Sequence, residues 1–127
     1  MSLTLHVLEG RFAIVRLSPG AGLPWWAATS EGLLSFTRSA EEASIICEAR
    51  RVPADAQAER GFRALRVAGP LPFDAIGVLA SVAVPLANGG VPILAISTFD
   101  TDYVLVREAS LDNAIRALRE AGHSVGE

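Results

Sequence analysis

The sequence contains no lysine, a single cysteine (Cys47) and no long apolar run. One cysteine excludes an internal disulfide and a cysteine-rich metal cluster. No apolar run approaches the roughly 18–20 residues that cross a bilayer, so we expect no membrane segment. The eleven basic residues, all arginines, are scattered among the acids. They form no basic stripe of the kind that neutralises phosphates, so nucleic acid is not expected as the main partner.

The composition that remains is that of a folded chain. Half of the 127 residues are hydrophobic and 20% are charged, which is too apolar for a disordered protein. The length fits one compact domain or two very small units that share a core. The N-terminal segment MSLTLHVLEGR lacks the features of a signal peptide, so we predict a cytoplasmic protein. Cys47, within the segment ASIICEA, is predicted to be a small buried hydrophobe.

The C-terminal half predicts alternating strands and helices. Residues 62–69 form a plausible strand. Asp74 is predicted as the N-cap of a helix, with Phe73 and Val78 at the two positions of a hydrophobic staple. Apolar residues recur at helical spacing after Asp74, and the segment 88–90, Asn-Gly-Gly, is expected to end the helix.

Two short apolar segments follow, residues 91–98 and 102–108, and they predict a β-hairpin. Ser110 is predicted to cap a second helix over residues 111–121, and residues 123–125 can form a closing strand. The resulting order is β-α-β-β-α-β, the split βαβ arrangement of ferredoxin-like domains. Two right-handed crossovers then place both helices on one face of an antiparallel sheet.

The N-terminal half is predicted to be mainly strand. Its central segment, residues 18–32, is too rich in glycine and proline for a long helix and has room for one short turn around Trp25-Trp26. Residues 53–61 are the predicted linker, which divides the chain into units 1–58 and 59–127. The strands expected in this half are residues 3–9, 11–17, 33–39 and 43–52.

Four segments carry a resemblance to a known family: FAIVRL, SIIC, FDAIGVLASVAVPLANGGVPILAISTFDTDYVLV and LDNAIRALREAGHSV. The chain resembles ACT-domain proteins of the small two-unit type related to the animal cytosolic arginine sensor. The resemblance implies an α+β fold, with a ferredoxin-like βαββαβ ACT domain preceded by a strand-rich, truncated ACT-like unit. It also implies regulatory binding of an amino acid at the interface between ACT units and side-by-side oligomers, and it does not imply catalysis. One covered sheet face and a short, apolar N-terminal unit predict a homodimer, and we predict that the protein is not an enzyme.

The same resemblance implies where a ligand is bound. The implied residues form three groups: the entry to the first helix, the start of the second strand of the domain, and the end of that strand with its turn. They are Asp74, Ala75, Ile76 and Gly77; Asn88, Gly89, Gly90, Val91, Pro92 and Ile93; and Ser97, Thr98, Phe99 and Asp100.

The residues themselves leave alternatives open at these positions. Gly77 lies where free backbone N–H groups of the first helix offer a seat for a carboxylate, or it permits tight helix–sheet packing. The Asp100 carboxylate suits an ammonium or guanidinium group, or an Asx turn. We assign Asp100 to the ligand and Asp102 to the turn. Phe99 is assigned to the core.

Other site chemistries have little support in the sequence. His6 and His123 are far apart and have no spaced partner, so no metal is expected. No phosphate-binding glycine loop or nucleophile elbow is present, and no cofactor is expected. Two alternatives to an amino-acid sensor stay open: a structural dimerisation module without a physiological ligand, and an uncharacterised enzyme that uses Asp100.

Overall fold

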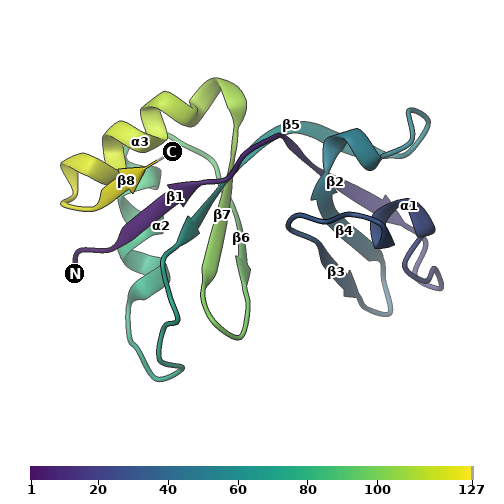
Figure 1. Cartoon of the computed structure of the whole chain (residues 1–127), viewed down its shortest axis with the longest axis horizontal. Helices are drawn as coiled ribbons and strands as arrows, with labels where there is room; N and C mark the ends of the chain where they lie inside the picture. Colours follow the sequence, from purple (N-terminus) through teal and green to yellow (C-terminus); the bar gives the residue numbers. More distant parts are fainter. Residues whose placement is uncertain (127) are drawn as a thin grey trace. The chain divides into compact units, whose positions relative to one another are not determined.

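The computed structural model describes residues 1–126 and divides into two compact units (Figure 1). Residues 10–62 form the N-terminal unit, and residues 1–9 with the chain from Arg63 onward form the C-terminal unit. The predicted boundary between residues 58 and 59 falls inside strand β5 (Ala58–Val67), which contributes to both units. The structure also differs from the prediction for residues 1–9, because their strand pairs within the C-terminal unit.

The C-terminal unit contains the predicted β-α-β-β-α-β order together with one strand from the start of the chain. Strand β1 (Thr4–Val7) pairs antiparallel with β5 and parallel with β8 (Ser124–Gly126). On its other side β5 pairs with β7 (Asp102–Arg107), which forms the predicted hairpin with β6 (Leu94–Ser97). The alternation of buried and more exposed side chains along β1 gives this strand one apolar face, which explains its place in the sheet.

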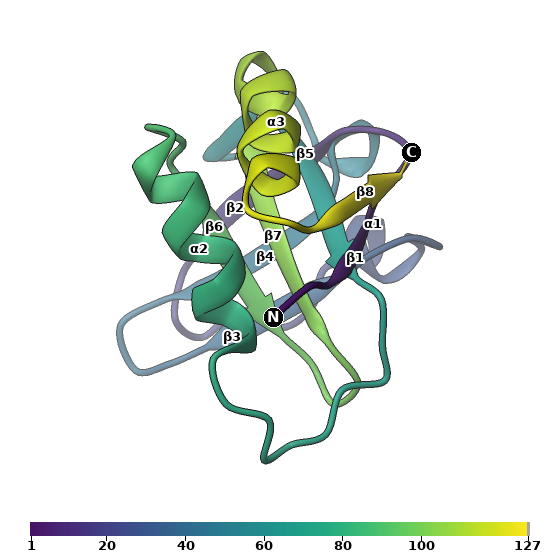
Figure 2. The same cartoon turned by 90° about the vertical axis from the view of Figure 1, so that its left-hand side faces the viewer.

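Both long helices cover one face of this sheet, as predicted (Figure 2). They are α2 (Val78–Asn88) and α3 (Leu111–Glu120), and α3 follows a short 3₁₀ turn, η2 (Glu108–Ser110). Their inward side chains pack on alternate residues of the strands and form one apolar core. The buried members of this core are Leu5, Val7, Leu65, Val67, Val82, Leu86, Val91, Val104, Val106, Leu111, Ala114, Ile115, Leu118 and Val125.

The predicted start of α2 is wrong. The helix begins at Val78, four residues after the proposed cap Asp74, and its N-cap is Gly77. Gly77 has φ 82° and ψ 10°, a left-handed conformation outside the helical region, so the helix begins only after this residue. The proposed staple does not form, because the side chain of Phe73 is 76% exposed. The helix ends at Asn88 as predicted.

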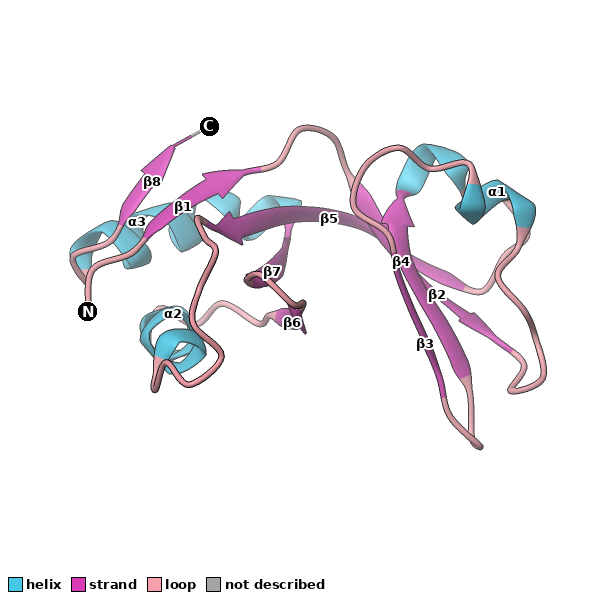
Figure 3. Ribbon diagram, turned by 60° about the horizontal axis from the view of Figure 1, so that its bottom comes forward, coloured by secondary structure: helices cyan, strands magenta, loops and turns pink. Residues whose placement is uncertain are grey.

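The N-terminal unit is a small sheet with little helix (Figure 3). Its strand order is β3 (Ser35–Arg38), β4 (Ala43–Glu48), β2 (Phe12–Leu17) and the first part of β5. The predicted linker 53–61 is wrong in its second half, since residues 58–61 are part of β5.

A second apolar core lies in the N-terminal unit. The short helix α1 (Trp25–Ala28), at the predicted position, and the 3₁₀ turn η1 (Ala49–Arg51) complete the unit. Cys47 is fully buried in this core, which confirms its predicted role, and Trp26 packs against the core. The neighbouring Trp25 side chain is 78% exposed.

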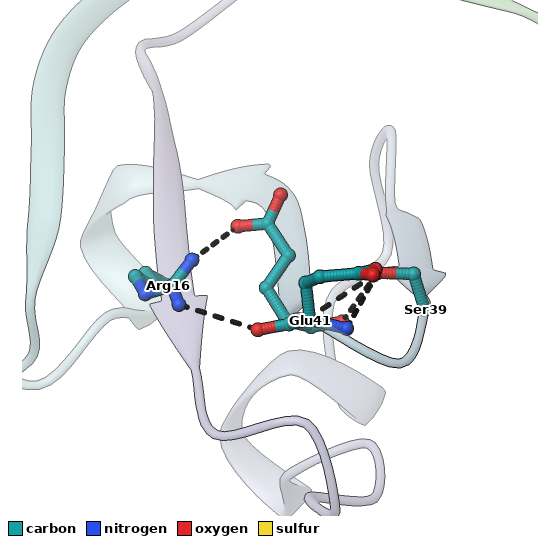
Figure 4. A network of polar contacts seen from close by, with 4 residues as sticks. Arg16, Ser39 and Glu41 are labelled. Atoms are coloured by element: carbon teal, nitrogen blue, oxygen red, sulfur yellow. Dashed lines mark hydrogen bonds and ion pairs between the residues drawn. The ribbon is translucent and has the colours of Figure 1, made fainter.

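A polar cluster fastens the turn between β3 and β4 to strand β2 (Figure 4). Arg16 donates from Nη1 to the carboxylate of Glu42 at 2.6 Å and from Nη2 to the main-chain oxygen of Glu41 at 3.4 Å. The Ser39 hydroxyl accepts the main-chain N–H groups of Glu41 and Glu42 at 3.2 and 3.3 Å. The Arg16 and Glu42 side chains are 50% and 48% exposed, so this ion pair shapes the turn and adds little stability.

Candidate functional site

An open cleft of about 430 Å³ lies in the C-terminal unit. One wall is the loop that leads from β5 to α2 together with the first turn of α2, and the other wall is the tip of the β6–β7 hairpin. The residues that line the cleft are Leu71, Pro72, Phe73, Ala75, Gly77, Val78, Leu79, Ala80, Ser97, Thr98, Phe99, Asp100, Thr101 and Asp102.

The helix wall presents the start of α2 to the cleft. The first N–H groups of an α-helix have no acceptor within the helix. The N-cap residue of α2, Gly77, makes no side-chain cap, and the first turn of this helix contains no acid. Val78, Leu79 and Ala80 line the cleft at this end. The N-terminus of a helix carries a partial positive charge and open donors, so this wall favours a carboxylate.

The other wall of the cleft, the tip of the β6–β7 hairpin, is held together by hydrogen bonds between its own residues. Ser97 donates from its hydroxyl to the Asp102 carboxylate at 2.6 Å across the register pair that these two residues form. The main-chain N–H and the hydroxyl of Thr98 both donate to the carbonyl oxygen of Thr101, at 2.8 and 3.0 Å. The Asp102 carboxylate therefore bonds within the hairpin, which agrees with its assignment to the turn, and the residue also lines the cleft.

Asp100 differs from Asp102 in having no such partner. Its side chain is exposed, and within residues 1–126 its carboxylate has no hydrogen-bond or ion-pair partner. The cleft thus has an unpaired negative group on one wall and an uncapped helix N-terminus on the other. A molecule with a carboxylate and a cationic group matches both walls.

Two aromatic rings stand at the rim of the cleft. The rings of Phe73 and Phe99 meet edge to face, with 4.6 Å between their centroids and 83° between their planes. The assignment of Phe99 to the core is wrong, since its side chain is 78% exposed. Phe99 occupies the tip of the hairpin, beyond the last pair of the ladder, where the sheet no longer covers it. Ile76, on the loop beside Phe73, is 90% exposed.

The structure brings together part of the predicted site. Six of the predicted residues line the cleft: Ala75, Gly77, Ser97, Thr98, Phe99 and Asp100. Asp74 and Ile76 lie on the same loop, but they are exposed and do not line the cleft. The packing alternative for Gly77 is wrong, because a Cβ at Gly77 would meet no atom within 4 Å.

The segment 88–93 lies at the far end of α2. This helix has eleven residues, so its two ends are separated by about 16 Å at 1.5 Å per residue. Val91 is buried in the core, and Gly90 adopts a left-handed φ of 76° that ends the helix. A Cβ on Gly89 would approach the Ala117 side chain to 3.3 Å. Conformation and helix packing therefore account for the two glycines. The remaining predicted positions of this segment are Asn88, Pro92 and Ile93, and Ile93 packs against the core.

The cleft also contains residues on both walls that the sequence does not single out. The sequence predicts that the helix starts at Asp74, so it does not indicate that Val78, Leu79 and Ala80 form the first turn of α2 beside the cleft. Thr101 lies between two aspartates in a polar turn, which gives no sign that it is only 6% exposed. Leu71 and Pro72 have the pattern of an ordinary loop. Only Gly77, a residue suited to a left-handed break before a helix, offers a signal in the sequence.

Metal chemistry has no geometric basis in the part of the chain that the structure describes. Residues 1–126 contain no group of three or more His, Cys, Asp or Glu side chains arranged to hold a metal ion. His123 is buried and structural: its Nδ1 accepts the main-chain N–H of Leu3 at 3.0 Å, and Nε2 lies 2.7 Å from the carbonyl oxygen of Ser81. The helices of the same residues include none that is long and apolar enough to cross a bilayer.

Sequence comparison finds relatives for both halves of the chain. A family model described as ACT domain matches residues 57–120, half of the chain, and a second model, for an N-terminal domain, matches residues 10–55. The cytosolic arginine sensor for mTORC1 subunit 1 from Bos taurus is 36% identical over 66 residues, and the Homo sapiens protein is 39% identical over 59 residues. These matches cover 51% and 46% of this chain but 20% and 18% of the relatives, so the matched segment spans about a fifth of their length.

Solved structures resemble the chain over nearly its whole length. A protein from Agrobacterium tumefaciens has a TM-score of 0.93 and 38% identity, with 100% of this chain and 95% of that chain covered. The regulatory subunit of aspartate kinase from Thermus thermophilus, in its ligand-free form, has a TM-score of 0.63 at 12% identity, with 93% and 97% covered. At that identity the likeness shows the fold alone. With a family model over half of its length and this ferredoxin-like fold, the chain belongs to the ACT-domain family.

Proposed function

We propose that this chain is a cytoplasmic regulatory protein that binds an amino acid in the cleft between the start of α2 and the β6–β7 hairpin, without catalysing a reaction. The observation that carries the proposal is the pairing of an unpartnered Asp100 carboxylate with an uncapped helix N-terminus across one cleft. The α-carboxylate of an amino acid matches the helix end. Its ammonium group, or a guanidinium side chain, matches Asp100.

The names of relatives support a ligand of this class. The curated relatives are named as arginine sensors. L-arginine is therefore the first probe. Its guanidinium group offers a second cation, so it can satisfy Asp100 in either orientation.

The proposal includes a second copy of the chain over the open side of the cleft. Phe73, Ile76 and Phe99 are 76%, 90% and 78% exposed at its rim, and large apolar side chains grouped on a surface are typical of an interaction site. A homodimer that covers this rim would enclose the ligand between two ACT units. The predicted residues 88–93, which lie away from the cleft within one chain, belong to the proposal as a contribution of the second copy.

The test of binding is a thermal-shift screen of the twenty amino acids, beginning with L-arginine. At about one hundred times its Kd, a ligand stabilises the folded state by about 2.7 kcal/mol, which corresponds to a rise in Tm of about 10 °C for a small domain. The rise should disappear in Asp100→Asn and remain in Asp74→Asn. Asp74 is a matched control, because it is an exposed aspartate on the neighbouring loop that does not line the cleft. A rise that is equal in both variants contradicts the site, and no rise with any amino acid favours the structural dimerisation module.

The test of assembly is sedimentation velocity of the wild type and of Phe99→Ser. We expect a species of twice 13.4 kDa for the wild type, and a shift toward the monomer in Phe99→Ser, because the substitution removes apolar area from the rim. A wild type that sediments only as a 13.4 kDa species refutes the homodimer. Turnover of any bound amino acid that is lost in Asp100→Asn would instead favour the enzyme alternative.

A further inference from the structure

We propose that Thr101 and Gly69 form a latch that fastens the tip of the β6–β7 hairpin to the end of β5 and so positions Asp100 in the cleft. Thr101 is the positioning residue, and Gly69 provides the space that the latch needs. The latch itself requires no ligand, whereas its consequence for affinity rests on the proposed function.

Thr101 is unusual among the residues of the hairpin tip. Its neighbours from Ser97 to Asp100 are exposed, but Thr101 is 6% exposed. Its hydroxyl donates to the carbonyl oxygen of Val67, the last residue of β5, at 2.5 Å. A buried hydroxyl must satisfy its donor, and here it does so across 34 positions of sequence. This bond joins the turn to a strand that pairs on its far side with β1.

Gly69 approaches the same turn closely. A Cβ on Gly69 would lie 2.9 Å from the main-chain oxygen of Asp100 and 3.2 Å from the Cβ of Thr101. That oxygen in turn accepts the main-chain N–H of Leu71 at 2.7 Å. Because the nearest atom is backbone, any side chain at position 69 would push the turn away from the loop. The glycine is required here by close approach, since its φ lies outside the left-handed region.

These contacts hold both walls of the cleft at one point. The loop that continues from Leu71 to Gly77 supplies one wall, and its first N–H is bonded to Asp100. The Asp100 main chain is therefore held by Leu71 and by its neighbour Thr101, while its carboxylate stays unpaired. A carboxylate that is positioned through its backbone and not through side-chain bonds keeps its hydrogen-bonding capacity for a ligand, and a preorganised group loses less entropy on binding.

The ligand-free test is hydrogen exchange of single amides, followed by NMR. Thr101→Val keeps the shape of the side chain and removes the donor, so exchange of the Leu71 amide should accelerate about tenfold or more. Exchange of the Val91 amide, which donates to Leu86 at the far end of α2, should change less than twofold. Thr101→Ser keeps the hydroxyl and should restore slow exchange at Leu71. Equal acceleration of both amides, or none at Leu71, overturns the latch.

Gly69→Ala should produce the same local acceleration at Leu71. Its matched control is Gly20→Ala, because a Cβ on Gly20 would meet no atom within 4 Å and the φ of Gly20 is also outside the left-handed region. Gly20→Ala should leave the Leu71 amide unchanged. If Gly69→Ala behaves like Gly20→Ala, the close approach is not a constraint and the role of Gly69 is refuted.

The binding test uses L-arginine and isothermal titration calorimetry at a temperature where circular dichroism shows each variant to be folded. Thr101→Val should weaken binding about tenfold, and Thr101→Ser should bind like the wild type. If Thr101→Val lowers only the stability of the protein, the folded variant should bind L-arginine with the affinity of the wild type. That result overturns the positioning role of Thr101. If the wild type does not bind L-arginine, the proposed function fails for this probe, while exchange at Leu71 still decides the latch.

Discussion

Substitution of Gly77 by alanine should destabilise the C-terminal unit through backbone strain alone. Gly77 has φ 82° and ψ 10° at the N-cap of α2, and a Cβ there would meet no atom within 4 Å. The left-handed conformation costs an L-residue about 1–2 kcal/mol. Alanine also restricts the unfolded chain, which offsets about 0.4–1 kcal/mol. The net loss should therefore be about 1 kcal/mol in the free energy of unfolding.

The assay is urea denaturation followed by two signals that belong to different units. The C-terminal unit contains helices of eleven and ten residues, so circular dichroism in the far ultraviolet reports mainly on it. Both tryptophans, Trp25 and Trp26, lie in the N-terminal unit, and their fluorescence reports on that unit. Gly77→Ala should lower the midpoint of the dichroism transition by roughly 0.3–1 M urea, for a denaturant slope of about 1–3 kcal/mol/M.

Two control variants test whether the left-handed φ of Gly77 causes the loss of stability in Gly77→Ala. Gly20→Ala has open space and an ordinary φ, so its midpoint should stay equal or rise slightly. Gly77→Asn should cost less than Gly77→Ala, because asparagine adopts the left-handed region more readily. If Gly77→Ala matches Gly20→Ala, or if asparagine and alanine cost the same, the argument from φ is refuted.

A core leucine, the buried cysteine and a hydrogen-bonded glutamate give three more predictions. Leu118 is fully buried in the core, so Leu118→Ala should cost about 3 kcal/mol in urea denaturation, whereas the exposed-site control Val84→Ala should stay within about 0.5 kcal/mol. Burial, and then the Glu48 charge, raises the pKa of the Cys47 thiol, so at about pH 8 an aromatic disulfide reagent should label Cys47 only in urea; rapid labelling of the folded protein would contradict this. The Ser30 hydrogen bond, followed by the charge of Arg50, lowers the pKa of Glu48 in the folded protein. The ionised Glu48 therefore stabilises the fold above the ordinary carboxyl pKa, and this contribution is lost as the pH falls through the folded-state pKa. Ser30→Ala should reduce the loss of unfolding free energy between about pH 6 and pH 3, and an unchanged pH profile would argue against it.

The chemistry of the candidate site is partly readable from short-range patterns. Turn chemistry predicts the assignment of Asp102 to the hairpin, and the bond from Ser97 to the Asp102 carboxylate agrees with it. The role of Asp100 stays a prediction. The error at Asp74 has a local cause. A good capping residue is followed by apolar residues at helical spacing, but the left-handed conformation of Gly77 delays the start of the helix to Val78.

The sequence by itself determined the order of the strands and helices of the C-terminal unit, and which face of each of these elements is apolar. Periods of two and of about 3.6 residues, with glycines at the ends of helices, depend on neighbours within a few positions. They predicted the βαββαβ order and the hairpin, and the right-handed crossover rule then placed both helices on one face of the sheet.

Only the tertiary structure decided which distant segments meet. Strand β1 pairs with β5 and β8, the Thr101 hydroxyl reaches Val67, and the start of α2 faces Asp100, whereas residues 88–93 lie at the other end of that helix. Each of these outcomes depends on pairing and close approach between residues far apart in the chain. A local pattern shows that a strand has an apolar face or that a threonine lies in a turn, but the partner is chosen by how all the faces pack together.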